Sequence, residues 1–129
     1  MLRLESYPML ARIVFPVTLA GVLLLTLLPA RFLPDLGTAV TLHDDKLQHA
    51  IAFAVLAALG SLGWPEHKAR IILVLALTGA AIEVLQGSQL IGRDLDGFDW
   101  VADCAGMALG LTIAGWTSRR VGRRVGGLP

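Results

Sequence analysis

Charged residues are scarce in this chain: Asp, Glu, Lys and Arg make up 16% of its 129 residues, while hydrophobic residues make up 55%. A soluble domain usually has about 25% charged residues, and the mean hydropathy here is +0.68. This shortage of charge excludes an ordinary soluble domain and indicates an integral membrane protein. Cysteine is almost absent too: Cys104 stands alone, which excludes an intramolecular disulfide.

Several catalytic motifs are also missing from the sequence. The chain contains no HExxH pair, no GxSxG nucleophile turn and no glycine-rich phosphate loop followed by lysine. Their absence excludes the enzyme classes that depend on those motifs. The net charge is only +1, and we expect no nucleic-acid partner.

What the chain does have is a series of apolar segments, each close to the ~20 residues that a helix needs to cross a bilayer. The predicted spans are 12–29, 46–64, 68–86 and 98–116. They predict an all-α protein, an integral membrane bundle of four transmembrane helices that forms a single domain over residues 1–129. Trp64, Trp100 and Trp116 fall at predicted span ends, where tryptophan favours the headgroup level.

Basic residues are unevenly divided between the two sides of the predicted bundle. Arg31, Lys46 and Arg93 fall on one side, and the other eight fall on the side of the two termini: Arg3, Arg12, Lys68, Arg70, Arg119, Arg120, Arg123 and Arg124. The positive-inside rule therefore predicts that both termini are cytoplasmic. We expect a multi-pass protein of the bacterial inner (cytoplasmic) membrane, in contact with the lipid bilayer.

The outer side then receives eight of the ten acidic residues. Several polar side chains lie just inside the outer ends of the spans, and the candidate ligand-binding cluster comprises Asp45, Lys46, His49, Glu83, Gln86, Arg93, Asp96, Asp99 and Asp103. Ionisable side chains at membrane depth normally face the bundle interior or a watery cavity and pair with one another. The sequence therefore predicts an outward-facing polar pocket.

Asp99 and Asp103 are four residues apart, so they share a helix face and repel each other unless a cation or a proton lies between them. Lys46, Arg93 and a charged His49 are the candidates within the chain. An external metal ion or a ligand amine is the other possibility. We assign no metal ligands and expect no cofactor, apart from a divalent cation as one way to balance this acidic cluster.

Helix capping is the simpler explanation for part of the cluster. Asp45 begins a sequence with the spacing of a capping box, and Asp96 begins an acidic analogue of it. Capping does not explain Glu83, which lies near a predicted helix C-terminus, or Asp103, which lies a turn or more inside a span. For these residues and His49, a closed polar network and a ligand site remain equally open alternatives.

Small residues form a stripe on the fourth predicted span, at Ala102, Gly106, Gly110 and Ala114. Ala50 and Ala54 begin a similar face on the second span. Such stripes let helix backbones approach closely. The Gly106/Gly110 face could serve packing within one chain or a homo-oligomer, because both uses need the same surface.

The ordered set of polar and small residues resembles the VanZ-like family. The pattern opens with Asp45-Lys46-x-x-His49-x-x-x-Phe53 and Glu83-x-x-Gln86, and it continues with Gly92-Arg93, Asp96, Asp99 and Asp103-x-x-Gly106-x-x-x-Gly110. Family members commonly carry Asn where this chain has Asp103. The resemblance implies a multi-span bacterial membrane protein of the cell envelope, since the family is named from a member linked to low-level resistance to the glycopeptide teicoplanin.

These features favour a membrane protein whose outward pocket recognises a cell-envelope headgroup, such as a lipid-linked wall precursor, a phospholipid or a glycopeptide, or that contributes to teicoplanin-type resistance. Lys46, His49 and Arg93 would contact phosphate, while the acidic residues would hold an amine or a cation. The alternative is an outer-leaflet membrane enzyme, a hydrolase or transferase on a lipid-linked substrate, that uses His49, Glu83 and Asp103. Transport is a distant third hypothesis, because no pair of interrupted helices is evident.

Overall fold

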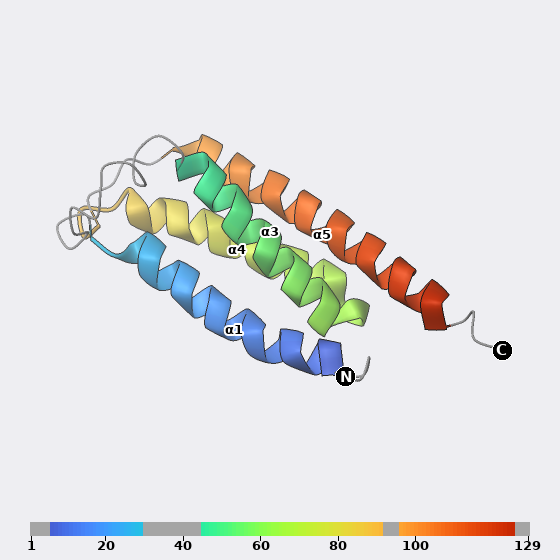
Figure 1. Cartoon of the computed structure of the whole chain (residues 1–129). Coiled ribbons are helices and arrows are strands. Elements are labelled where there is room, and N and C mark those ends of the chain that lie inside the picture. Colours follow the sequence, from blue (N-terminus) through green and yellow to red (C-terminus); the bar gives the residue numbers. More distant parts are fainter. Residues whose placement is uncertain (1–5, 30–44, 92–95, 126–129) are drawn as a thin grey trace.

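The computed structural model describes residues 6–29, 45–91 and 96–125. Within these ranges the chain is all-helical, with four α-helices and one short 3-10 helix: α1 (Ser6–Leu27), α3 (Asp45–Gly63), η2 (Pro65–His67), α4 (Lys68–Gln86) and α5 (Gly97–Val125). The helices pack side by side as an elongated bundle (Figure 1). The all-helical architecture that the sequence predicts is thus confirmed for this part of the chain.

The helix boundaries match the predicted spans closely in the middle of the chain and less well at its ends. α4 has the bounds of the third predicted span, and α3 is shifted from the second by one residue. α1 begins six residues before the first predicted span, and α5 continues nine residues beyond Trp116. The extension of α5 carries four arginines, which a prediction based on hydropathy leaves out, whereas the extension of α1 is mostly apolar.

Three of the described helices are long and apolar enough to cross a membrane: Ser6–Leu27, Lys46–Gly63 and Pro65–Gln86. α5 has 29 residues, but Asp99, Asp103 and its later arginines lower its hydropathy. The distribution of side chains also suits lipid. Leu77 is 62% exposed while Asp103 is 0% exposed, so large apolar side chains cover part of the outer surface and a carboxylate lies inside, as expected for helices in lipid.

α3 and α5 make the most extensive contact between any two helices. A Cβ atom added at Gly106 would lie 2.1 Å from the carbonyl oxygen of Ala50, and one at Gly110 would lie 2.1 Å from that of Ala54. Only glycine fits at such a close backbone crossing. The predicted small-residue faces therefore pack against each other within one chain, and an oligomer would have to use another surface.

α1 is attached to the bundle through the end of α3. The Arg12 guanidinium donates a hydrogen bond of 2.6 Å from Nε to the carbonyl oxygen of Gly63 and lies 5.8 Å from the centre of the Trp64 ring. Phe15 packs edge-on against Trp64 with ring centroids 5.6 Å apart. The hydrogen bond gives a partner to a carbonyl that the end of α3 would otherwise leave without one. The two ring contacts add packing between α1 and the end of α3.

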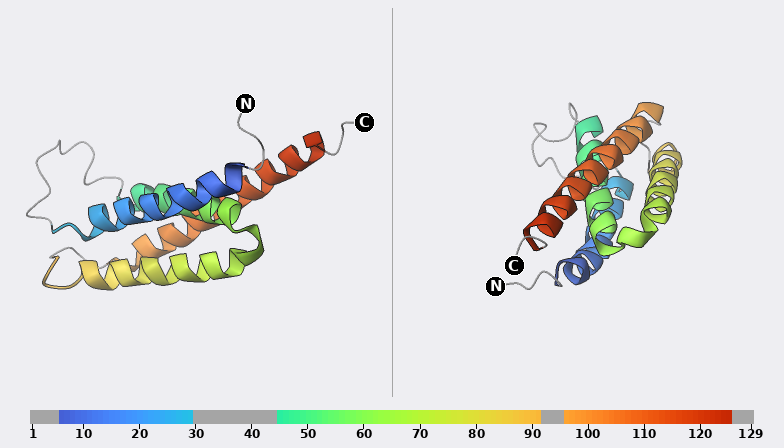
Figure 2. Two further views of the ribbon diagram at one scale, coloured as in Figure 1. Left: turned by 90° about the horizontal axis from the view of Figure 1, so that it is seen from below. Right: turned by 90° about the vertical axis from the view of Figure 1, so that its right-hand side faces the viewer.

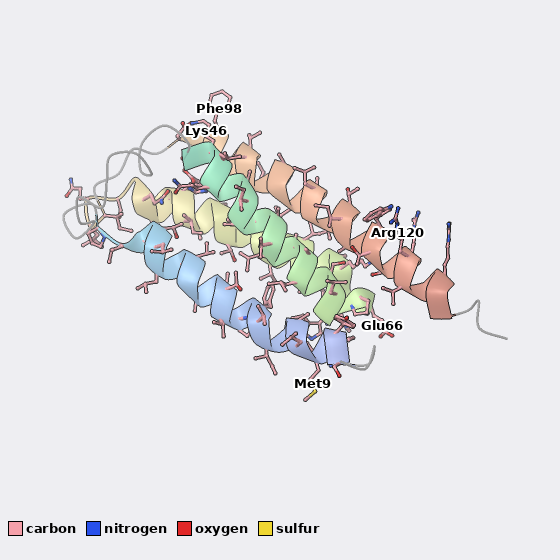
Figure 3. All side chains as sticks on the ribbon, in the orientation of Figure 1. Met9, Lys46, Glu66, Phe98 and Arg120 are labelled. Atoms are coloured by element: carbon pink, nitrogen blue, oxygen red, sulfur yellow. The ribbon has the colours of Figure 1, made fainter. Side chains whose placement is uncertain are left out.

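The two ends of the bundle differ in what they carry. The N-terminal end of α1 and the C-terminal end of α5 lie at the same end as the turn between α3 and α4, and α5 extends beyond that turn (Figures 1 and 2). Lys46 and Phe98 lie at the opposite end, whereas Glu66 and Arg120 lie at the end with the termini (Figure 3).

Candidate functional site: a polar cluster inside the helix bundle

Three helices bring an imidazole and two carboxylates together inside the bundle. His49 lies one turn into α3, Glu83 lies one turn before the end of α4, and Asp103 lies in the second turn of α5. His49 Nδ1 is 2.8 Å from Asp103 Oδ1 and 4.0 Å from Glu83 Oε1. All three side chains are buried. We call His49, Glu83 and Asp103 the deep group.

His49 Nδ1 and Asp103 Oδ1 lie at hydrogen-bond distance, and the tautomer of the ring decides which atom donates. With an ionised Asp103 carboxylate, which can only accept, Nδ1–H is the donor. Both carboxylate oxygens of Glu83 are buried and have no hydrogen-bond partner among the described residues. Since an unsatisfied buried carboxylate is costly, Glu83 is the residue of the deep group that most needs a further partner.

A second polar group lies nearer the end of the bundle. Lys46 Nζ is 2.6 Å from Asp96 Oδ2 and 3.3 Å from Asp99 Oδ1. The Lys46 side chain is 54% exposed and that of Asp96 is 37% exposed, whereas Asp99 is buried. We call Lys46, Asp96 and Asp99 the rim group. The Lys46 ammonium and the Asp96 carboxylate are thus accessible from outside the bundle, whereas the Asp99 carboxylate lies beneath them.

The two groups resolve the repulsion that the sequence predicts between Asp99 and Asp103. Asp99 pairs with Lys46 at 3.3 Å, and Asp103 pairs with His49 at 2.8 Å. Of the three partners proposed from the sequence, Lys46 thus contacts both Asp96 and Asp99, and His49 contacts Asp103.

Asp96 also caps a helix, as the sequence predicts. Its Oδ1 accepts a hydrogen bond of 2.9 Å from the backbone N–H of Phe98, at the first turn of α5. The Lys46 ammonium and this N–H lower the pKa of Asp96 below its ordinary value. Because the pKa is lowered on folding, this carboxylate stabilises the fold at pH values above the ordinary pKa, and the contribution is lost as the pH falls through the lowered one.

The other predicted site residues lie elsewhere. Gln86 is buried but turns away from the deep group, and its Nε2 donates a hydrogen bond of 2.9 Å to the carbonyl oxygen of Thr26. It therefore ties α4 to the end of α1. Asp45 is the first residue of α3, and Arg93 lies outside the described residues.

Two contacts of the cluster were not foreseen from the sequence. A Cβ atom added at Gly79 would lie 2.7 Å from Asp103 Oδ2 and 3.4 Å from Phe53 Cζ, so the absent side chain leaves room for the carboxylate against α4. The Trp100 indole donates a hydrogen bond of 3.0 Å to the carbonyl oxygen of Ala76. Trp100 thus joins α5 to α4 beside the cluster, a role that its position at a span end does not reveal.

Two surface grooves lie at the end of the bundle that carries the termini. One, of about 410 Å³, is lined by Phe15, Trp64, His67, Arg70 and Ile71. The other, of about 470 Å³, lies between the start of α4 and the later part of α5 and includes Trp116 and Arg119. Neither groove is lined by a residue of the deep group or the rim group.

Comparisons with protein-family models, with curated proteins and with solved structures find no match to this chain.

Proposed function

We propose that the chain is a four-span protein of the bacterial inner membrane whose polar cluster faces outward. α5 lies along α3 (Figure 1), and its 29 residues exceed the ~20 that a span needs. Its two carboxylates are buried against other helices rather than exposed to lipid. The basic residues of α5 and of the start of α4 lie at the end with the termini, which supports a cytoplasmic position for that end.

The proposed function is recognition of a cell-envelope headgroup that carries both a phosphate and an amine. The rim group is the observation that carries this proposal, because a half-exposed ammonium lies 2.6 Å from a partly exposed carboxylate. A zwitterionic headgroup can replace that contact with two of its own, the phosphate on Lys46 and the amine on Asp96. The VanZ-like resemblance supports a role in the cell envelope and a link to glycopeptide resistance.

Lipid binding to the purified protein tests this proposal. Native mass spectrometry would measure retention of phosphatidylethanolamine, which has phosphate and amine, and of phosphatidylglycerol, which lacks the amine. We expect tighter binding of phosphatidylethanolamine and a loss of about tenfold in Lys46→Ala, since a hydrogen bond to a charged group contributes ~1.5 kcal/mol or more. Asp96→Asn should reduce the preference between the two lipids.

Lys68→Ala is the matched control, because Lys68 is an exposed lysine at the opposite end of the bundle. Equal binding of both lipids, unchanged in folded Lys46→Ala, would refute recognition by the rim group. A parallel assay in a susceptible host would compare teicoplanin resistance conferred by the same variants. Resistance that persists in Lys46→Ala and in Arg93→Ala would separate any resistance function from the cluster.

An outer-leaflet enzyme that acts on a lipid-linked substrate is the second candidate. The 2.8 Å contact between His49 and Asp103 favours it, since a carboxylate that orients an imidazole is a common arrangement in general acid–base catalysis. The enzyme ranks second because His49, Glu83 and Asp103 are buried, out of reach of a substrate. A substrate atom would reach the imidazole only after the helices moved apart.

A further inference from the structure

We propose that the deep group binds one divalent transition-metal ion through His49, Glu83 and Asp103. This inference goes beyond headgroup recognition and does not depend on it, because the rim group supplies the headgroup contacts and the deep group supplies the metal ligands. The two groups share no residue, so each can be altered separately.

The distances between the ligand atoms suit a small ion. One ligand atom from each residue lies within 4.8 Å of the other two, and the ring nitrogen is 2.8 Å from Asp103 Oδ1 and 4.0 Å from Glu83 Oε1. Zinc binds nitrogen and oxygen at roughly 2.0–2.2 Å in tetrahedral geometry, which puts neighbouring ligand atoms ~3.4 Å apart. The observed distances lie on either side of that value, so small side-chain movements bring all three atoms to bonding distance.

Glu83 is the independent observation that points to a ligand. Its side chain is 5% exposed, and neither carboxylate oxygen has a hydrogen-bond partner among the described residues. The oxygens lie beside the imidazole and near Asp103, so a cation held by those two residues would also meet Glu83. A divalent ion would balance two buried carboxylates at once, which a neutral imidazole does not do.

The surroundings hold the Asp103 carboxylate in place. The backbone of α4 at Gly79 approaches Asp103 Oδ2 so closely that a Cβ atom there would lie 2.7 Å from it. Phe53, which is buried, lies against the same glycine. Packing of this kind keeps the Asp103 carboxylate in one geometry, as a metal ligand requires.

The ligand types indicate which ions the site would take. One imidazole and two carboxylates form a set of nitrogen and oxygen ligands that suits zinc or manganese. Three protein ligands leave a fourth position open, as in zinc sites that bind water or substrate. Binding through Nδ1 displaces the proton that the ring shares with Asp103, so metal uptake should release a proton.

Metal titration of the full-length protein tests the proposal. Protein purified in detergent and stripped with a chelator would be titrated with zinc and, separately, with manganese, and bound metal would be counted by mass spectrometry. Cobalt would serve as a spectroscopic probe, because its visible absorption reports imidazole and carboxylate coordination. We expect one ion per chain and a loss of affinity of at least ~100-fold in Glu83→Gln, since even residues that only orient ligands cost 10–100-fold.

Asp96→Asn is the matched control: it removes a carboxylate of the rim group and should leave the stoichiometry and the cobalt spectrum unchanged. Asp103→Asn serves as a second variant if Glu83→Gln fails to fold. The proposal would be overturned if the wild-type protein bound only adventitious zinc. It would also be overturned if folded Glu83→Gln bound zinc as tightly as the wild type. The deep group would then be a closed network with a protonated carboxyl. Neither outcome affects the lipid-binding result, which depends on the rim group.

Discussion

Replacing Gly106 with alanine is expected to destabilise the bundle by about 3 kcal/mol, the upper end of the usual cost of overpacking. The added Cβ atom would lie 2.1 Å from the carbonyl oxygen of Ala50 and 2.8 Å from its Cα. Both neighbours are backbone atoms, which cannot rotate away as a side chain does. α3 and α5 would therefore have to separate, and His49 and Asp103 are carried by these same two helices. Unfolding in mixed detergent micelles measures the effect.

Gly115→Ala is the control for this prediction, because Gly115 lies on the same helix and has nothing within 4 Å of an added Cβ atom. The same chemical change should be neutral or slightly stabilising there, since alanine favours a helix over glycine by up to ~1 kcal/mol. Equal stability of Gly106→Ala and Gly115→Ala would contradict the close crossing of α3 and α5.

Replacing His49 with leucine is expected to cost ~3 kcal/mol or more, because a buried carboxylate that loses its hydrogen-bond donor costs more than the ~1–3 kcal/mol of an unsatisfied neutral group. Asp103 is 0% exposed and lies 2.8 Å from the His49 ring, and Glu83 lies 4.0 Å from it. Without the imidazole, two carboxylates lie close together with no positive or donating ring between them. The free energy of unfolding should fall accordingly.

Two further variants separate this electrostatic effect from a loss of packing. Ile51→Ala shortens a side chain of α3 that is 55% exposed, and we expect little change from it. His49→Leu combined with Asp103→Leu should be more stable than His49→Leu alone, because an apolar pair removes the buried carboxylate that loses its imidazole donor. A single His49→Leu variant as stable as the wild type would show that the imidazole does not compensate these carboxylates.

Much of the cluster was predictable from the sequence because charged side chains are costly to bury without a partner. His49, Glu83 and Asp103 lie within apolar segments. Ionisable side chains in such segments normally face the interior of the bundle and pair with one another. The stripe at Gly106 and Gly110 likewise predicted a close helix crossing, although its partner could not be chosen without coordinates. The VanZ-like resemblance stays a hypothesis from the sequence.

Other contacts could not be predicted because they depend on how one helix is rotated against another. Gln86 lies three residues after Glu83, which places both on one side of α4, yet its amide donates to α1 at Thr26 rather than to the deep group. Gly79 matters only because Asp103 faces it across the interface between α4 and α5. Hydropathy predicts where each span begins and ends, but it does not predict which face of one helix contacts its neighbour.

The central claim is that the polar cluster lies at the outer end of a bundle that crosses the membrane four times, and labelling of single cysteines tests it most directly. In a Cys104→Ala background, cysteine would replace Glu66, Phe98 or Arg120, which are exposed and lie at known ends of the bundle (Figure 3). A membrane-impermeant maleimide added to intact cells should label Phe98→Cys alone, and it should label Glu66→Cys and Arg120→Cys only after the membrane is opened. Labelling of Phe98→Cys and Arg120→Cys from the same side would contradict a membrane-spanning α5, and labelling of Glu66→Cys in intact cells would place the cluster on the cytoplasmic side.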